Sequence, residues 1–224
     1  MHVADTARRR PRLLLTLLGC AALAAGLARA DAPADAPVDR VRVVTTLGSF
    51  VIRLESARAP LTTANFLAYV KSGHYNGTLF HRVIANFVIQ GGGYDDRHQL
   101  KNTLAPVPNE SGNGLSNKRG TVGLARAESP HSGNSQFYVN LTDNDELDPT
   151  PLRWGYAVFG RVVEGLEVVE KIARTPTGSV GPWPKDAPLE PVVIERIEML
   201  TSTGALIPPP AATPAATPAP AAPH

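Results

Sequence analysis

Short runs of β-branched and aromatic residues recur between residues 41 and 199, separated by loops rich in Gly, Asn, Asp and Pro. Runs of this length and composition are typical of β-strands. The first two runs flank Leu47-Gly48-Ser49, which predicts a β-hairpin closed by a glycine turn. The predicted strands are 41–45, 50–54, 78–84, 87–91, 121–125, 136–141, 156–162 and 191–199.

Two segments have apolar residues at helical spacing instead. Thr62 or Thr63 is expected to cap the first helix, and Gly73 to end it. Eight short strands with only two helices predict a mainly β fold, a closed eight-stranded antiparallel barrel capped by two α-helices. The predicted helices are 62–72 and 166–172.

The first 30 residues differ in composition from the rest of the chain. Four arginines between residues 8 and 12 precede an apolar run, Leu13 to Leu27, which ends in Ala28-Arg29-Ala30. A charged segment, a short apolar run and a small-residue cleavage site are the features of a secretory signal peptide. We therefore expect residues 1–30 to be a signal peptide and the exported protein to start near Asp31.

The chain has one cysteine, Cys20, which rules out an intrachain disulfide and a cysteine-based zinc site. The segment Leu17-Leu18-Gly19-Cys20 also resembles a bacterial lipoprotein box. Lipid anchoring through Cys20 therefore remains an alternative to a free exported protein.

Two segments outside the predicted strands are rich in Ala and Pro. Residues 31–38 are expected to form a linker, and residues 201–224, with seven Pro and eight Ala, a disordered tail. The folded unit then spans 39–200. Although the net charge is +2, the signal segment alone holds five Arg against one Asp. The remainder has no basic excess, which argues against an electrostatic nucleic-acid binder.

Three stretches carry candidate chemistry: 80–93 reads FHRVIANFVIQGGG, 120–127 reads GTVGLARA, and 134–139 reads NSQFYV. In the first, strand alternation places Arg82 on the same face as large apolar residues. This pattern indicates a guanidinium held in an apolar groove, with a solvated arginine on an edge strand as the alternative.

These stretches, in this order, resemble the cyclophilins, a family of peptidyl-prolyl cis-trans isomerases. The later stretch GYAVFGRV at 155–162 extends the resemblance, which covers residues 41–200. It implies that 39–200 is a monomeric isomerase domain acting on proline-containing polypeptides without cofactor, metal or nucleic acid. Together with the signal segment, the chain looks most like the periplasmic cyclophilins of Gram-negative bacteria. A periplasmic protein that assists the folding of exported proteins is the implied function.

Carried over position by position, the resemblance makes Arg82 the catalytic arginine, with Gln90 and Phe87 beside it. A non-catalytic chaperone or peptide-binding module on the same barrel is the alternative, and the buried guanidinium favours the enzyme. His81 is expected on the opposite strand face, as a structural residue. The implied substrate-binding residues are Val88, Ala125, Arg126, Ala127, Gln136, Tyr138, Leu147 and Tyr156.

Four positions depart from the commonest cyclophilin pattern. Val88 and Tyr138 replace a usual Met and Phe, and both keep an apolar wall. Glu146 and Tyr156 replace a usual Trp and His at the rim. Because a carboxylate at 146 removes an aromatic contact, weak cyclosporin binding is expected.

Overall fold

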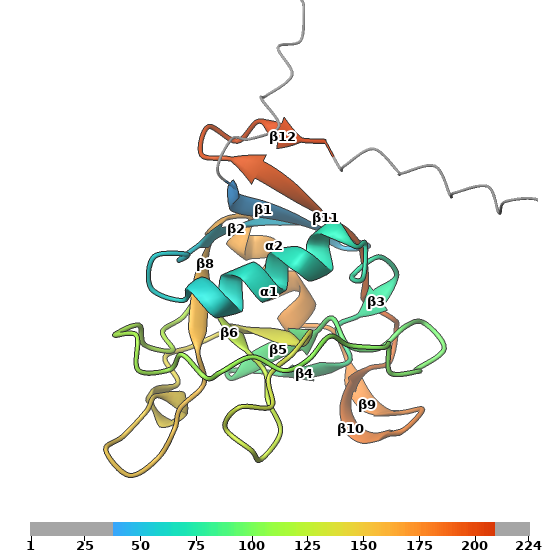
Figure 1. Cartoon of the computed structure of the whole chain (residues 1–224). Coiled ribbons are helices and arrows are strands. Elements are labelled where there is room, and N and C mark those ends of the chain that lie inside the picture. Colours follow the sequence, from blue (N-terminus) through green and yellow to red (C-terminus); the bar gives the residue numbers. More distant parts are fainter. Residues whose placement is uncertain (1–37, 209–224) are drawn as a thin grey trace, which may run out of the picture. The chain divides into compact units, whose positions relative to one another are not determined.

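The computed structural model describes residues 38–208; the predicted signal peptide, nearly all of the linker and most of the tail lie outside the described residues. Within this range the chain forms mainly β structure with two α-helices (Figure 1). The elements are β1 (Val38–Thr45), β2 (Gly48–Leu54), α1 (Pro60–Lys71), β3 (Thr78–Leu79), β4 (Arg82–Ile84), β5 (Val88–Gly91), β6 (Thr121–Leu124), β7 (Phe137–Asn140), the 3-10 helix η1 (Asp145–Leu147), β8 (Val158–Glu164), α2 (Leu166–Ala173), β9 (Thr177–Val180), β10 (Trp183–Pro188), β11 (Val193–Thr201) and β12 (Leu206–Ile207).

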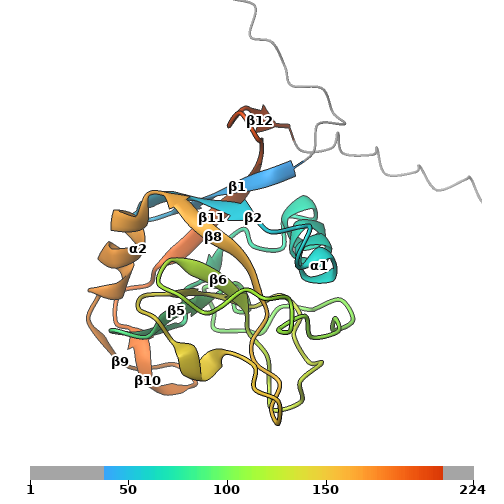
Figure 2. The same cartoon turned by 90° about the vertical axis from the view of Figure 1, so that its left-hand side faces the viewer.

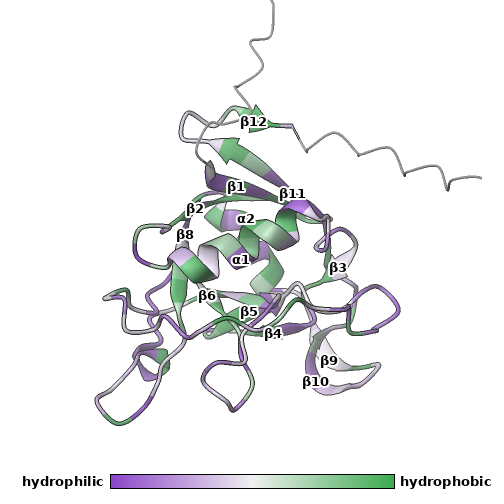
Figure 3. Ribbon diagram, viewed as in Figure 1, coloured by the Kyte–Doolittle hydropathy of each residue, from purple (hydrophilic) through white to green (hydrophobic). Residues whose placement is uncertain are grey.

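Ten of the strands described in residues 38–208 form one curled antiparallel sheet, a half-barrel. Its order is β12-β11-β1-β2-β8-β6-β7-β5-β4, and β3 pairs with β11 outside this path. Figure 2 shows α1 and α2 on opposite sides of the curled sheet. The strands and helices carry most of the apolar residues, and the loops most of the polar ones (Figure 3).

The predicted closed eight-stranded barrel is not confirmed. The reason lies in the predicted strand 78–84, which divides into β3, paired with β11, and β4, paired with β5. Phe80 between them lies beside the residue that precedes β11, since its N–H donates to the carbonyl of Val192 at 2.9 Å. The two short strands therefore lead from one end of the sheet to the other without a continuous ladder.

The predicted β1–β2 hairpin is confirmed, with Thr45 opposite Gly48 at its turn. Gly48 has a φ of +131°, and a Cβ there would come within 2.9 Å of Val168 on α2. A side chain at this turn would therefore meet both backbone strain and a steric clash.

The expected capping of α1 by Thr62 or Thr63 is wrong. The helix begins at Pro60, and both threonines are buried in its first turns. The free N–H groups of Leu61 and Thr62 instead donate to the Glu110 carboxylate, at 3.0 and 2.7 Å. This side chain, 48 or more positions away along the chain, supplies the cap and a favourable negative charge at the helix N-terminus.

The core is built from buried residues of the sheet and of both helices, with Val169 and Ile172 contributed by α2. Phe66 of α1 is its centre, with ring centroids 5.7 Å from Phe137 on β7 and 5.1 Å from Phe159 on β8. Because these rings are fully buried, α1 is fixed against the strands that carry the candidate site. No helix described in residues 38–208 is long and apolar enough to cross a membrane.

Two features of the fold were not predicted. β9 and β10 form a separate hairpin, docked through Trp183 against His81, Tyr94 and His98. β11 continues to Thr201 and β12 pairs with it. Regular structure therefore extends beyond residue 200, where the sequence placed the end of the folded unit.

Candidate functional site

Strand register aligns four predicted or neighbouring site positions in one row. Arg82 on β4 lies opposite Gln90 on β5, Gln90 opposite Tyr138 on β7, and Tyr138 opposite Gly123 on β6. Directly opposed residues of antiparallel strands project to the same face. The curled sheet therefore presents a guanidinium, an amide and a phenol ring side by side across four strands.

These side chains line a cavity of about 200 Å³. It contains nine of the eleven residues that the resemblance implied. Ala127 and Gln136 lie outside its lining, although Gln136 contacts it through Gln90. The lining residues are Arg82, Phe87, Val88, Gln90, Ala125, Arg126, Tyr138, Leu147 and Tyr156.

Arg82 is held by an amide rather than by a carboxylate. Its Nη1 donates to Oε1 of Gln90 at 3.2 Å, and Nε2 of Gln90 donates to Oε1 of Gln136 at 3.0 Å. The guanidinium carbon lies 5.9 Å from the centroid of the Phe87 ring. Because an amide oxygen orients the guanidinium without neutralising it, the positive charge stays directed at the cavity beside an apolar wall.

Arg126 was expected to act through its backbone, but its side chain also shapes the cavity. The guanidinium carbon lies 4.4 Å from the Tyr156 ring centroid, a cation–π contact. Its nitrogens donate to the carbonyls of Gly155, at 3.3 Å, and Trp154, at 3.1 Å. These bonds fold the side chain back onto the loop before β8 and fix Tyr156 as one wall.

The phenol of Tyr138 is buried, and its hydroxyl donates to Oδ1 of Asn117 at 2.6 Å. Burial raises the pKa of Tyr138 well above its usual value, so the phenol is neutral at physiological pH. The ring lies over Gly123, where the absence of a side chain makes room for it. Sequence reasoning missed Asn117, since a lone loop asparagine carries no local signal.

His81 takes no part in the cavity, in line with the sequence expectation. It is buried between Tyr94 and Trp183, with ring centroids 4.7 and 5.4 Å away. Burial lowers its pKa from 6.5 to about 4, so its ring is neutral at physiological pH.

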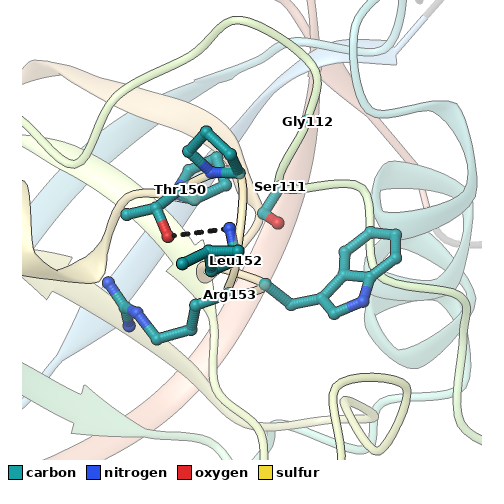
Figure 4. Close-up of a pocket in the computed structure, with 8 residues that line it drawn as sticks. Ser111, Gly112, Thr150, Leu152 and Arg153 are labelled. Carbon is teal, nitrogen blue, oxygen red and sulfur yellow. Dashed lines mark hydrogen bonds between the residues drawn. The ribbon is translucent and has the colours of Figure 1, made fainter.

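A second hollow, of about 370 Å³, lies on the turn that follows the rim of the first (Figure 4). It is lined by Ser111, Gly112 and residues 149–154, none of which is a predicted site residue. Leu152 is 99% exposed, and its N–H donates to the Thr150 hydroxyl at 3.3 Å. The one charged residue that lines this hollow, Arg153, is exposed.

The chain is similar to known isomerases over most of this fold. Residues 40–199 match the family described as cyclophilin type peptidyl-prolyl cis-trans isomerase/CLD. Peptidyl-prolyl cis-trans isomerase cyp18 of Streptomyces antibioticus is 52% identical over 163 residues, which are 71% of this chain and 98% of the relative. Peptidyl-prolyl cis-trans isomerase B of Escherichia coli strain K12 is 46% identical over 156 residues, which are 68% of this chain and 94% of the relative.

Solved structures agree with these matches. A cyclophilin type peptidyl-prolyl cis-trans isomerase of Cryptosporidium parvum, crystallised in the presence of the dipeptide Ala-Pro, has a TM-score of 0.60 and 25% identity. The match covers 72% of this chain and 99% of that one. Sequence family and fold agree: the chain belongs to the cyclophilin family of peptidyl-prolyl cis-trans isomerases.

Proposed function

We propose that this isomerase assists the folding of exported proteins in the periplasm, with the 200 Å³ cavity as its proline site and Arg82 as the catalytic residue. The observation that carries the catalytic assignment is the guanidinium of Arg82, held by Gln90 at the edge of a cavity that Phe87 and Val88 also line. Phe87 and Gln90 complete the catalytic set.

The chemistry needs no proton transfer. Rotation about the peptide C–N bond is slow because nitrogen donates its lone pair to the carbonyl, which raises a barrier of about 18–20 kcal/mol. When the bond twists, the lone pair returns to the nitrogen and becomes able to accept a hydrogen bond. A donor aimed at that nitrogen therefore binds the transition state more strongly than the ground state. Arg82 suits this role because its guanidinium is permanently charged and carries several donors.

Magnitudes show that Arg82 needs help from the cavity. An acceleration of about five orders of magnitude requires about 7 kcal/mol, whereas one charged hydrogen bond contributes about 1.5–3 kcal/mol. The apolar wall of Phe87 and Val88 can grip the proline ring while the preceding carbonyl turns. Pre-oriented dipoles, among them the Gln90 amide, supply the remainder without reorganisation during the reaction.

The role in folding exported proteins rests on residues 1–30, which have the three features of a secretory signal. Expression of the full chain in a Gram-negative host, followed by fractionation and mass measurement of the mature N-terminus, tests it. We expect a periplasmic protein that starts near Asp31. A lipid-modified N-terminus at Cys20 would establish the anchored alternative, and retention of residues 1–30 in the cytoplasm would contradict export.

Substitution of Arg82 tests the catalytic assignment. We expect Arg82→Ala to lower turnover of an X-Pro peptide by a factor of about 100 or more, about 2.7 kcal/mol of transition-state stabilisation. The melting temperature should change little because the side chain lines a cavity. Arg82→Lys should restore little, since an ammonium lacks the planar fork. A protease-coupled assay measures the rates, and an Arg82→Ala protein that keeps most of its activity would disprove the assignment.

The refolding of an exported protein with a slow prolyl phase tests the wider role. The wild-type chain should accelerate that phase, and Arg82→Ala should not. If both proteins raise the yield equally without changing the rate, the chain acts on folding as a peptide-binding chaperone.

A further inference from the structure

One buried asparagine, Asn117, connects the walls of the cavity. It lies in the loop before β6, is 0% exposed and lines no part of the cavity itself. Its side chain and backbone N–H are hydrogen-bonded to Tyr138, Tyr156 and Asp148, which line the cavity or directly follow a lining residue, and its carbonyl to Asn144, which is bonded to Phe87.

The first connection is to the Tyr138 wall. The Tyr138 hydroxyl donates to Oδ1 of Asn117 at 2.6 Å, and the same oxygen accepts a bond from Nδ2 of Asn140 at 3.2 Å. With its hydroxyl fixed, the phenol ring cannot swing toward or away from the cavity. The phenol ring is thereby held at both ends, by β7 and by Asn117.

The second connection is to the Leu147 rim. The backbone N–H and the Nδ2 amide of Asn117 both donate to Oδ1 of Asp148, at 2.7 and 2.8 Å. Asp148 directly follows Leu147, so this forked pair of bonds sets the position of the rim. Because the acceptor is charged, each of these bonds is stronger than a bond between neutral groups.

Two further bonds reach the remaining walls. Nδ2 of Asn117 lies 3.4 Å from the carbonyl oxygen of Tyr156, the wall that also carries Arg126. The carbonyl of Asn117 accepts from the N–H of Asn144 at 2.8 Å, and Nδ2 of Asn144 donates to the carbonyl of Phe87 at 3.0 Å.

We infer that Asn117 is a positioning residue of this isomerase, which sets the spacing of the cavity walls directly at Tyr138 and through Asp148 at Leu147. An asparagine fits this place because it offers both an acceptor, for the phenol, and donors, for the carboxylate. The inference rests on the proposed assignment of the cavity as the proline site. It makes specificity for the proline ring depend on a residue that never touches it.

Two substitutions disrupt the hydrogen bonds between Asn117 and Asp148, one at the donor and one at the acceptor. Asn117→Asp keeps Oδ1 for Tyr138 but turns the second donor into an acceptor facing the Asp148 carboxylate. Asp148→Ala removes the acceptor from a residue that is only half buried, so it is the variant more tolerant of folding. Asp148→Asn retains an oxygen that can accept both bonds and should restore most of the loss.

We expect Asp148→Ala and Asn117→Asp to raise KM for an X-Pro peptide by at least about fivefold, the factor that corresponds to about one ordinary hydrogen bond. The catalytic constant kcat should change less, because Arg82 and Gln90 stay in place. Asn113→Asp is the matched control: its Nδ2 donates to the Val158 carbonyl outside the cavity, so the same change there should lower stability without raising KM.

The readouts separate this inference from the proposed site. Active Arg82→Ala protein would mean that the site is assigned wrongly. Inactive Arg82→Ala protein together with a wild-type KM in Asp148→Ala would overturn the positioning role alone. The positioning role would also be overturned if Asn113→Asp lost as much activity as Asp148→Ala, in proportion to its unfolded fraction. The loss in both variants would then reflect general stability.

Discussion

At the scale of single residues, Gly123 shows how closely the cavity is packed. The Tyr138 ring covers this glycine so completely that a Cβ would overlap the ring atoms. The neighbouring strand must therefore carry a residue without a side chain where the phenol lies across it. A glycine in a buried strand interior is otherwise unfavourable, and here the close approach of a side chain explains it.

Gly123→Ala should therefore displace the Tyr138 ring and disturb the proline site. We expect the KM for an X-Pro peptide to rise about tenfold or more, the scale of effect that a shift of about 1 Å in a binding group can produce. Gly112→Ala is the matched control, since nothing lies within 4 Å of a Cβ at that position. Equal kinetics in both variants would contradict the close contact between Gly123 and Tyr138.

His81 should make the free energy of unfolding depend on pH in the acid range, whereas turnover should not depend on its protonation. Its pKa is about 4 in the folded protein against 6.5 ordinarily, so the unfolded chain binds the proton more readily. The stability due to its neutral ring is complete above pH 6.5 and falls as the pH drops toward 4, by about 3 kcal/mol. Urea midpoints between pH 8 and 4 measure this loss.

Turnover by the folded enzyme should stay nearly flat between about pH 6 and 9, because arginine does not titrate there. His81→Phe should flatten the stability curve. A histidine-like limb in the rate profile near pH 6.5 would show that a proton-transfer group takes part in the reaction.

At the scale of elements, η1 contributes Leu147 to the cavity lining and carries Glu146 next to it. Glu146 is exposed on η1, and Nη2 of Arg153 donates to its backbone carbonyl at 2.6 Å and to that of Asp148 at 3.0 Å. These bonds hold the backbone on both sides of Leu147, which lines the cavity. An exposed carboxylate therefore stands next to a lining residue.

Glu146→Trp should tighten cyclosporin binding by at least about tenfold, since loss of an interface tryptophan commonly costs 2 kcal/mol or more, about thirtyfold in affinity. Peptide turnover should change less. Titration of both proteins with the drug measures the difference, and tight inhibition of the wild-type chain would show that position 146 does not control the affinity.

The elements also show what the sequence could and could not predict. Runs of β-branched and aromatic residues located the strands of the larger sheet up to β11, with β3 and β4 joined as one strand, and the resemblance located Arg82 and most of the cavity lining. β9 and β10 escaped notice because the hairpin is half exposed and broken by prolines, so it has no continuous apolar face. The roles of Glu110 and Asn117 depend on partners brought near only by the fold, and no local pattern reveals such contacts.

At the scale of the whole molecule, the last described strand, β12, belongs to the larger sheet. Ile207 is buried and lies opposite Met199 of β11, whereas residues 209–224 lie beyond the described range. The two parts of the C-terminal segment should therefore respond differently to truncation.

Deletion of residues 209–224 should leave turnover and stability unchanged. Deletion of 201–224 should lower the free energy of unfolding by about 2 kcal/mol or more, because it removes the buried Ile207 and uncovers β11. Urea unfolding of the two truncated proteins makes the comparison. If deletion of 209–224 lowered the free energy of unfolding as much as deletion of 201–224, the Ala/Pro segment would have to pack against the domain.

The row of Arg82, Gln90, Tyr138 and Gly123 across four strands has a kinetic consequence. Its members are up to 56 positions apart in sequence. The adjacent strands β4 and β5 bring Arg82 to Gln90 locally, but Gln90 meets Tyr138 only when the long-range ladder between β5 and β7 forms. Such non-local pairings close late, because chain entropy must be lost before their contacts contribute. No hairpin or fragment of the chain can hold the whole row, so catalytic competence belongs to the completed sheet. During refolding, the return of activity should coincide with the final assembly of the sheet. The recovery of turnover therefore measures when folding is complete.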